Sequence, residues 1–371
     1  MKNRLDWYAI LLVAFAFLSS GLGSGYASGQ IPLQFFCTGG GWFSIFAVWV
    51  FTAFMCLFCA MAYHVGSVEK FEKPSDAFIY YAGKSGAKIF DVLTLLTVGV
   101  MSISMFAGCG ATIEQYTGVP QYVGAIAMGV FACVIVCMGI NKLTTVLSGI
   151  GVVLLVFIIL VGIASFADPE MSLWDAANKV PQLVDEGKVI EPGLYGYVNP
   201  WLTPIYYVGC CIILLFPLCV EWGKSKINNK TEAVLSGIGS GLFFGGTGMI
   251  MAYTIMLNLD YIVEHGIQVP ILAAIARNLP VLEPAFALVI ILAIFSTITG
   301  FLWLIGRRFA EDGTTKQRII VIALSIFGIF FGSLIPFSKF ISIVTPTSGI
   351  FGLALFICMI VQHLRKKPFT H

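Results

Sequence analysis

Charged side chains are scarce in this sequence, and their scarcity excludes most classes of soluble protein. Only 11% of the 371 residues are charged, whereas a soluble domain typically carries about 25%. Hydrophobic residues make up 58% of the chain, and its mean hydropathy is +0.93. A net charge of +2 also argues against nucleic acid as a partner. The composition therefore predicts a protein embedded in a lipid bilayer.

Groups that bind metal ions or catalyse reactions are equally sparse. All ten cysteines lie in or beside apolar runs, so they form neither a disulfide framework nor the ligand set of a metal site. The apolar runs contain no paired carboxylates, no histidine cluster and no nucleophile with a neighbouring base. We therefore expect no enzyme activity and no cofactor. A proton-coupled carrier usually keeps a buried ionisable relay, and the absence of one here disfavours proton coupling.

Ten apolar runs approach the roughly 20 residues that a helix needs to span a bilayer. We therefore expect an all-α membrane protein with ten transmembrane helices. The runs extend approximately from Trp7 to Phe36, Trp42 to Tyr63, Ile89 to Ile113, Tyr122 to Met138, Leu143 to Phe166, Pro200 to Val220, Ala233 to Leu257, Pro284 to Ile305, Ile319 to Ile335, and Phe340 to Val361.

The lysines and arginines predict how these helices are oriented. If the N-terminus is cytoplasmic, 17 of the 21 lie on the cytoplasmic side, and only Lys179, Lys188, Arg277 and Lys339 lie outside. Lys and Arg in short loops collect on the cytoplasmic side of membrane proteins. We therefore expect a multi-pass protein of the cell membrane with both termini in the cytoplasm.

The longest polar connection, from Ala167 to Val198, divides the ten runs into two groups of five. Because five is odd, two similar groups would cross the membrane in opposite directions, as inverted repeats do in transporters. We therefore expect one transmembrane domain over residues 1–371, with repeats at about 5–166 and 198–362.

The leading run of each group is interrupted. In the first run, Ser19 to Gly25 is a stretch of Ser, Gly and Leu that favours a broken helix, although Gly21, Gly25 and Gly29 could instead form a close-packing face. In the sixth run, helix-breaking residues recur at Pro200, Pro204, Gly209 and Pro217, although Pro and Gly are common in membrane helices. Broken backbone at membrane depth needs protein or a water-filled cavity around it, so we expect a solute site there.

The first break would expose backbone groups of both signs. Amides at Gly23, Ser24, Gly25 and Tyr26 suit a carboxylate, while carbonyls around Phe17 to Ser20 suit a cation. Hydroxyls of Ser296 and Thr297 could complete a sodium site, unless they bond only to their own helix. With no buried charge to match, a small neutral solute fits best. Its candidate contacts are Ser20, Gly21, Gly23, Ser24, Gly25, Tyr26, Ser102, Met105, Tyr206, Tyr207, Gly209 and Cys210.

The first run also resembles a known family. Its residues 23–30, Gly-Ser-Gly-Tyr-Ala-Ser-Gly-Gln, followed by Gln34-Phe35-Phe36, are similar to the first-span signature of the bacterial YkvI-like permeases, which are grouped with the amino acid–polyamine–organocation transporters. The resemblance implies a LeuT-type 5+5 inverted repeat with broken helices 1 and 6, in a bacterial cell membrane. The sequence departs from the family pattern at Ile31, where the family has Glu, and at Gly209 with Cys210 or Cys211, where it favours Ser and Asn.

The resemblance also implies the ligands of a sodium ion. These are the carbonyls of Phe17, Ser20 and Ala293 with the hydroxyls of Ser296 and Thr297. We therefore expect a secondary transporter that moves a small neutral solute, an amino acid in the first instance, by sodium symport. A proton-coupled or uncoupled permease, an exchanger, and a non-transporting sensor of the same fold remain alternatives. Arg277 lies in an outer segment that could cap the site or form only a surface ion pair.

Overall fold

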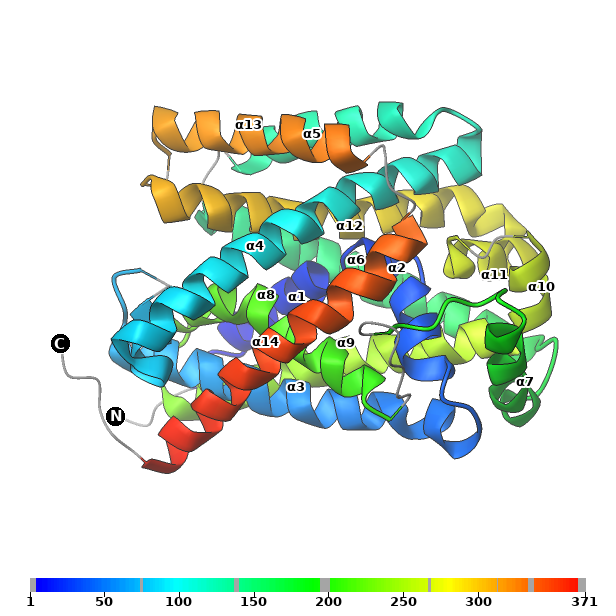
Figure 1. Ribbon diagram of the computed structural model, residues 1–371, viewed down its shortest axis with the longest axis horizontal. Coiled ribbons are helices and arrows are strands. Elements are labelled where there is room, and N and C mark those ends of the chain that lie inside the picture. Colours follow the sequence, from blue (N-terminus) through cyan, green and yellow to red (C-terminus); the bar gives the residue numbers. More distant parts are fainter. Residues whose placement is uncertain are drawn as a thin grey trace.

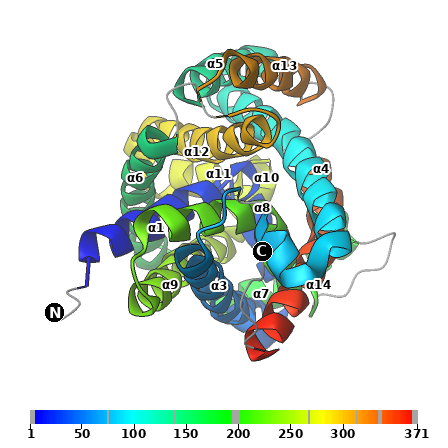
Figure 2. The ribbon, with the colours of Figure 1, turned by 90° about the vertical axis from the view of Figure 1, so that its left-hand side faces the viewer.

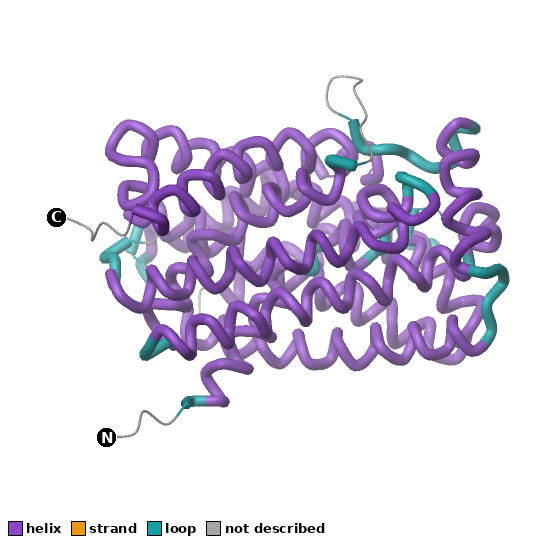
Figure 3. The backbone as a smooth tube through the Cα atoms, turned by 90° about the horizontal axis from the view of Figure 1, so that it is seen from below, coloured by secondary structure: helices purple, strands orange, loops and turns teal. Residues whose placement is uncertain are grey.

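The structure, a computed structural model, describes residues 5–73, 76–136, 140–193, 201–265, 268–311, 313–332 and 337–365. All regular elements in these ranges are helices (Figure 3). They are α1 Trp7–Gly21, α2 Ser24–Ala27, the π-helix η1 Pro32–Cys37, α3 Gly41–Glu69, α4 Asp76–Thr117, α5 Gln121–Val136, α6 Ile140–Ala167, α7 Leu173–Asp185, α8 Thr203–Lys226, α9 Lys230–Leu257, α10 Leu259–His265, α11 Pro270–Asn278, the 3-10 helix η2 Pro280–Leu282, α12 Glu283–Phe309, α13 Thr315–Gly332 and α14 Phe337–Arg365.

The helices confirm an all-α membrane protein. Eight helices within the described ranges are long and apolar enough to cross a membrane. The shorter apolar helices Trp7–Gly21 and Gln121–Val136 stand where the first and fourth spans are expected. The ten-span layout is therefore compatible with the structure, and the repeat boundaries stay a prediction.

Helix α4 begins 13 residues before the expected third span. A short segment from Asp76 leads to Gly83, whose φ of 69° and ψ of 175° put a kink in the helix. Glycine adopts this positive φ without the penalty that a side chain would bring. The apolar-run criterion misses the segment because Lys84 and Lys88 interrupt its hydrophobic pattern.

The first span is broken, as expected, but the break is narrower than Ser19 to Gly25. Helix α1 continues through Gly21, and α2 begins at Ser24 after Gly23, which has φ 19° and ψ 176°. The chain turns again at Gly29, with φ 91°, before the π-helix η1. The span therefore crosses the molecule in three helical pieces.

The sixth span is not broken within the described residues, and the prediction of a second break is wrong there. Helix α8 runs without interruption from Thr203 to Lys226. Pro204 stands in its first turn, where the missing N–H costs nothing, and Pro217 is accommodated inside it. Gly209 serves packing, because a Cβ at this position would overlap the Gly349 carbonyl of α14. Pro200 lies outside the described residues.

The helices are arranged around α1 and α8. Of the 18-residue apolar stretch of α8, 89% is buried, against 28% for α13, so α8 is central and α13 peripheral. Figure 2 shows α5 and α13 together at one edge, with α12 between them and the centre. Helix α1 begins and α14 ends at one end of the molecule, and α7, α10 and α11 cover the opposite end (Figure 1).

Candidate functional site

The break in the first span is joined to α12 first of all by the Thr297 side chain. The Gly23 amide donates to Thr297 Oγ1 at 2.9 Å, and Thr297 Oγ1 lies 2.9 Å from the Ser20 carbonyl and 3.3 Å from the Ser19 carbonyl. In an unbroken helix the Gly23 amide would bond the Ser19 carbonyl directly. The Thr297 hydroxyl thus takes the place of a lost backbone hydrogen bond.

A second hydroxyl binds the same turn. Ser296 Oγ donates toward the Ser19 carbonyl at 2.6 Å and the Ala293 carbonyl at 2.7 Å, and Thr297 Oγ1 is 3.2 Å from the Ala293 carbonyl. The hydroxyls therefore bond both to their own helix and across to α1.

Five buried oxygens meet between α1 and α12. They comprise the carbonyls of Ser19, Ser20 and Ala293 and the hydroxyls of Ser296 and Thr297. Neutral oxygens of this kind fit a hard cation such as sodium, whose ligands in broken-helix transporters are carbonyls and helix C-terminal ends. The arrangement differs from the expected set in the Ser19 carbonyl, which sequence reasoning did not single out. The cluster does not include the predicted Phe17 carbonyl. The Phe17 ring packs edge-on against the Phe244 ring, with ring centroids 5.6 Å apart.

A cavity of about 40 Å³ lies beside this oxygen cluster. Eight of the twelve predicted solute contacts line it, namely Ser20, Gly21, Gly23, Gly25, Tyr26, Met105, Tyr207 and Cys210. Ligand pockets usually measure about 300–1,000 Å³. The cavity is therefore too small for a solute as it stands, and a solute would need the surrounding helices to separate.

Four predicted contacts do not line the cavity. Ser24 instead places its amide 3.2 Å from Met105 Sδ and its hydroxyl 3.3 Å from the Ser104 carbonyl. Ser102 Oγ donates to the Val98 carbonyl one turn back in α4, at 2.7 Å. Tyr206 and Gly209 stand at the crossing of α8 with α14, where Gly349 approaches the Tyr206 backbone closely. Helix packing and local hydroxyl bonding account for these residues.

Several lining residues were missed from the sequence. They are Ile31, Met101, Cys211, Leu214, Leu215, Phe301, Ile341 and Thr345. Most are apolar residues inside apolar helices, which carry no local signal of their position. Thr345 is different, because Thr345-Pro346-Thr347-Ser348 is a polar, proline-containing interruption of the last span. It could have been recognised by the criterion that found the first break.

Two buried hydroxyls in the cavity wall have no hydrogen-bond partner among the described residues. These are Ser20 Oγ and Thr345 Oγ1, on residues that are 1% and 0% exposed. A buried hydroxyl without a partner costs about 1–3 kcal/mol. Such groups in a cavity wall indicate a place where a polar ligand can bind.

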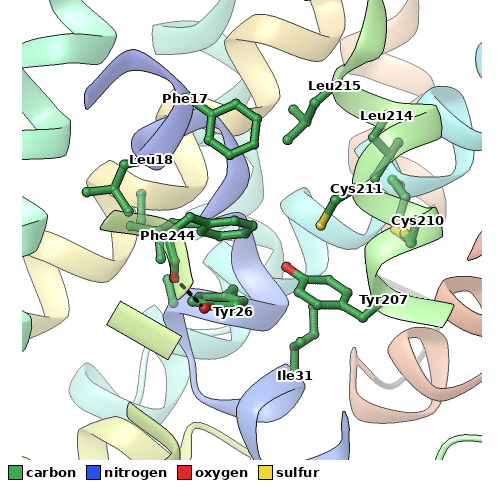
Figure 4. Close-up of a cluster of buried hydrophobic side chains, with 14 of the residues drawn as sticks. Phe17, Leu18, Tyr26, Ile31, Tyr207, Cys210, Cys211, Leu214, Leu215 and Phe244 are labelled. Atoms are coloured by element: carbon green, nitrogen blue, oxygen red, sulfur yellow. Dashed lines mark hydrogen bonds between the residues drawn. The ribbon is translucent and has the colours of Figure 1, made fainter. Parts of the chain in front are cut away.

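Aromatic rings close one side of the cavity (Figure 4). Tyr26 stacks on Phe244 with ring centroids 4.7 Å apart, and its hydroxyl donates to the Phe244 carbonyl at 2.8 Å. Tyr207 of α8 faces Tyr26 at 5.8 Å and stacks on Phe51 of α3 at 5.1 Å. Rings from four helices therefore form one layer over the break.

The end covered by α11 is held shut by contacts to the first span. The Ile271 amide donates to the Ser28 carbonyl at 3.1 Å, and Gln30 Nε2 donates to the Gln268 carbonyl at 3.1 Å. Arg277 Nη1 donates to the side-chain oxygen of Asn258 at 2.6 Å and to the Asp168 carbonyl at 2.8 Å. Arg277 therefore forms more than a surface ion pair, because it ties α11 to α9 and to the residue after α6.

Two curated proteins of Bacillus subtilis (strain 168) match nearly the whole chain. The uncharacterized protein YyaD is 25% identical over 373 residues, with 97% of this chain and 99% of YyaD covered. The uncharacterized membrane protein YkvI is 22% identical over 346 residues, with 92% of each chain covered. No family model matches the sequence. The similarity to YkvI is thus confirmed well beyond the first span.

Solved structures show the same fold. MhsT in complex with L-phenylalanine matches with a TM-score of 0.65 and 16% identity, over 96% of this chain and 90% of MhsT. A Na⁺-coupled sialic acid symporter matches with a TM-score of 0.63 and 11% identity, over 95% of this chain and 78% of the symporter. The second of these proteins is named as a Na⁺-coupled symporter. The chain therefore has the LeuT-type fold and is similar to the YkvI-like membrane proteins.

Proposed function

We propose that the protein is a secondary transporter that carries a small neutral amino acid by sodium symport with alternating access. The observation that carries this proposal is the meeting of a broken first span, a five-oxygen cluster and a cavity with two unpartnered hydroxyls. A purely structural break would leave no reason for unpartnered polar groups beside it.

The break supplies the polar end of the solute site. Amide groups at the start of a helical segment carry partial positive charge and attract carboxylates. The Gly23 amide is already bonded to Thr297, so the solute carboxylate would rely on the backbone that follows, together with Ser20 Oγ. The backbone amides after Gly23 and the Ser20 hydroxyl can form hydrogen bonds with the carboxylate and ammonium groups of a neutral amino acid.

The rest of the wall is apolar and suits an apolar side chain. Met101, Met105, Leu214 and Phe301 line the cavity, and their side chains carry no formal charge. Burying a charged solute side chain among them would cost several kcal/mol without a partner. We therefore favour aliphatic, sulfur-containing or aromatic amino acids over acidic and basic ones.

Sodium coupling rests on the oxygen cluster. In the structure, the hydroxyls of Ser296 and Thr297 approach carbonyls that a sodium ion would also use. On ion binding, these hydroxyls would turn their hydrogens away and present lone pairs. The ion would then link α12 to the broken span and favour the conformation that holds solute.

The orientation follows the positive charges. Lys and Arg residues concentrate at the end where α1 begins and α14 ends, which supports cytoplasmic termini in a bacterial cell membrane. The α11 end would then face outward, and its contacts with the first span would form the outer closure.

A stability screen tests this function. We expect at least one apolar amino acid to raise the Tm of the purified protein in sodium chloride more than in potassium chloride, because a ligand stabilises the state that binds it. The measurement is thermal unfolding in detergent with each of the common amino acids and each salt. A hit should then accumulate in proteoliposomes under an inward sodium gradient.

Other outcomes of the screen would contradict parts of the proposal. Equal stabilisation in the two salts, with uptake that ignores the sodium gradient, would reject symport and favour an uncoupled or proton-coupled permease. Binding without any accumulation would favour a sensor.

Thr345→Val should separate solute binding from folding. Because the Thr345 hydroxyl has no partner in the described part of the chain, its loss should leave Tm unchanged or slightly higher. Solute affinity should fall about tenfold if the hydroxyl bonds the solute. Ser102→Ala is the matched control, since Ser102 bonds only within α4. Equal solute affinities in the two variants would exclude Thr345 from the site.

A further inference from the structure

A second cavity lies directly along the helices that line the first. Helix α12 contributes Phe301 to the central cavity and Leu304 to the second, and α8 contributes Leu214 and then Pro217. Each step is about one helical turn toward the end where α12 finishes. Helix α4 follows the same order, from Met101 to Thr94. The second cavity therefore continues the central one toward the end of the molecule where α1 begins and α14 ends, and Figure 2 views the molecule from that end.

The second cavity has an excess of positive charge. Its charged lining residues are Lys73, Asp91, Arg307 and Arg308. Asp91 is bonded by Arg308 through both Nε and Nη2, so these two charges offset each other. Lys73 and Arg307 have no ion-pair partner among the described residues. Within the described chain, two cations at one small cavity therefore have no ion-pair partner, although the Asp76 carboxylate accepts from the Lys73 backbone amide at 3.1 Å.

A residue with a buried hydroxyl, Thr94, lines the same cavity as these cations. Thr94 is 3% exposed, lines the cavity and has no hydrogen-bond partner for its Oγ1 in the described chain. Threonine in a helix commonly donates to the carbonyl one turn back, as Thr112 does to Gly108 at 2.8 Å in the same helix. Thr94 lacks that bond and leaves its hydroxyl available to a ligand.

We propose that this second cavity is a binding site for a compact oxyanion, a phosphate or a carboxylate. Lys73 and Arg307 supply charge, and Arg is suited to bidentate contact with such groups. Thr94 supplies a buried donor. An anion held there would contact Thr94 of α4, Arg307 of α12 and Lys73, which precedes α4. It would thereby link these three parts of the chain beside α8. The site can be filled from the aqueous side or by a lipid headgroup, because Lys73 is exposed.

The test uses the full-length protein and needs no transported solute, so it can fail or succeed independently of the proposed transport. Purified protein in neutral detergent is titrated with sodium phosphate or sodium acetate, at constant sodium concentration and ionic strength with sodium chloride as the balance. We expect saturable stabilisation by one of these oxyanions beyond that given by chloride. Arg307→Gln should raise the half-saturating concentration about tenfold, and Thr94→Val several-fold. Arg318→Gln, which changes an exposed cation of α13 outside the cavity, should leave it unchanged.

The source of the anion is distinguished in lipid nanodiscs. If a headgroup fills the site, phosphatidylglycerol should stabilise wild type over Arg307→Gln and weaken the effect of added phosphate. If a free anion fills it, phosphate should act equally in phosphatidylcholine discs with and without phosphatidylglycerol. The site is rejected if oxyanions act no better than chloride, or if Arg307→Gln and Arg318→Gln shift the titration alike. Lys73→Gln replaces Arg307→Gln if the latter does not fold.

Discussion

Thr297→Val is expected to destabilise the protein strongly and to abolish the effect of sodium on its Tm. Valine keeps the shape of threonine but cannot accept from the Gly23 amide or donate to the Ser20 carbonyl. Each buried polar group left without a partner costs about 1–3 kcal/mol. The measurement is thermal unfolding with and without sodium chloride, followed by sodium-driven uptake of the solute found in the screen.

Thr299→Val is the matched control for that variant. Thr299 lies two residues along the same helix and is fully buried, but its hydroxyl donates only to the Phe295 and Ser296 carbonyls of α12. Its loss removes a local bond and leaves no orphaned amide, so we expect a cost of about 1 kcal/mol and an intact sodium response. Equal Tm values and equal sodium responses in the two valine variants would show that Thr297 does not hold the break.

Gly209→Ala is expected to cause the other large loss of stability, because alanine does not fit where α8 crosses α14. The variant tests why the sixth span contains glycine at this position. A Cβ at Gly209 would overlap the Gly349 carbonyl of α14. In the same crossing, a Cβ at Gly352 of α14 would overlap the Gly209 carbonyl. Forcing a methyl group into packed helix backbones costs about 1–3 kcal/mol and sometimes more. We expect a large loss of Tm or of folded protein, measured by thermal unfolding and size-exclusion chromatography.

Gly246→Ala provides the contrast in helix α9. No atom lies within 4 Å of a Cβ at Gly246, and alanine in a helix interior is favoured over glycine by about 0.5–1 kcal/mol. This variant should therefore be as stable as the wild type or more so. If Gly209→Ala were tolerated equally well, the close crossing of α8 and α14 would not be the reason for glycine at position 209.

The two predicted breaks, of which only the first is present in the described residues, show how far local sequence carries a prediction. Six of the seven residues at 19–25 are Ser or Gly, which have low helix propensity, so this stretch predicted broken backbone, and α1 does end there, at Gly21. Pro204, Gly209 and Pro217 gave a similar signal in the sixth span, yet α8 is continuous. Pro204 stands in the first turn of α8, and Gly209 lies against α14. Neither position can be recognised from the local sequence.

The candidate site likewise contains some residues that the sequence predicted and others that it did not. A cation site between the Ser296 and Thr297 hydroxyls and the carbonyls around Phe17 to Ser20 was predicted from residue type and spacing. In the structure these hydroxyls meet the carbonyls of Ser19 and Ser20, whereas the predicted Phe17 carbonyl is not in the cluster. Thr345 could have been recognised from the polar, proline-containing stretch at 345–348, but its lack of a hydrogen-bond partner could not. Thr94 was missed because an unpartnered hydroxyl is recognised only from the atoms around it.

The sequence by itself determined that the chain is a helical membrane protein whose first span cannot cross in one piece. Composition, apolar length and helix propensity act on each segment separately, so one sequence is enough to read them. Only the tertiary structure decided which oxygens converge, that Gly209 of α8 serves packing, and which residues with unpartnered hydroxyls line a cavity. Those properties depend on the distance between residues remote in sequence, such as Gly23 and Thr297, and no local pattern encodes that distance.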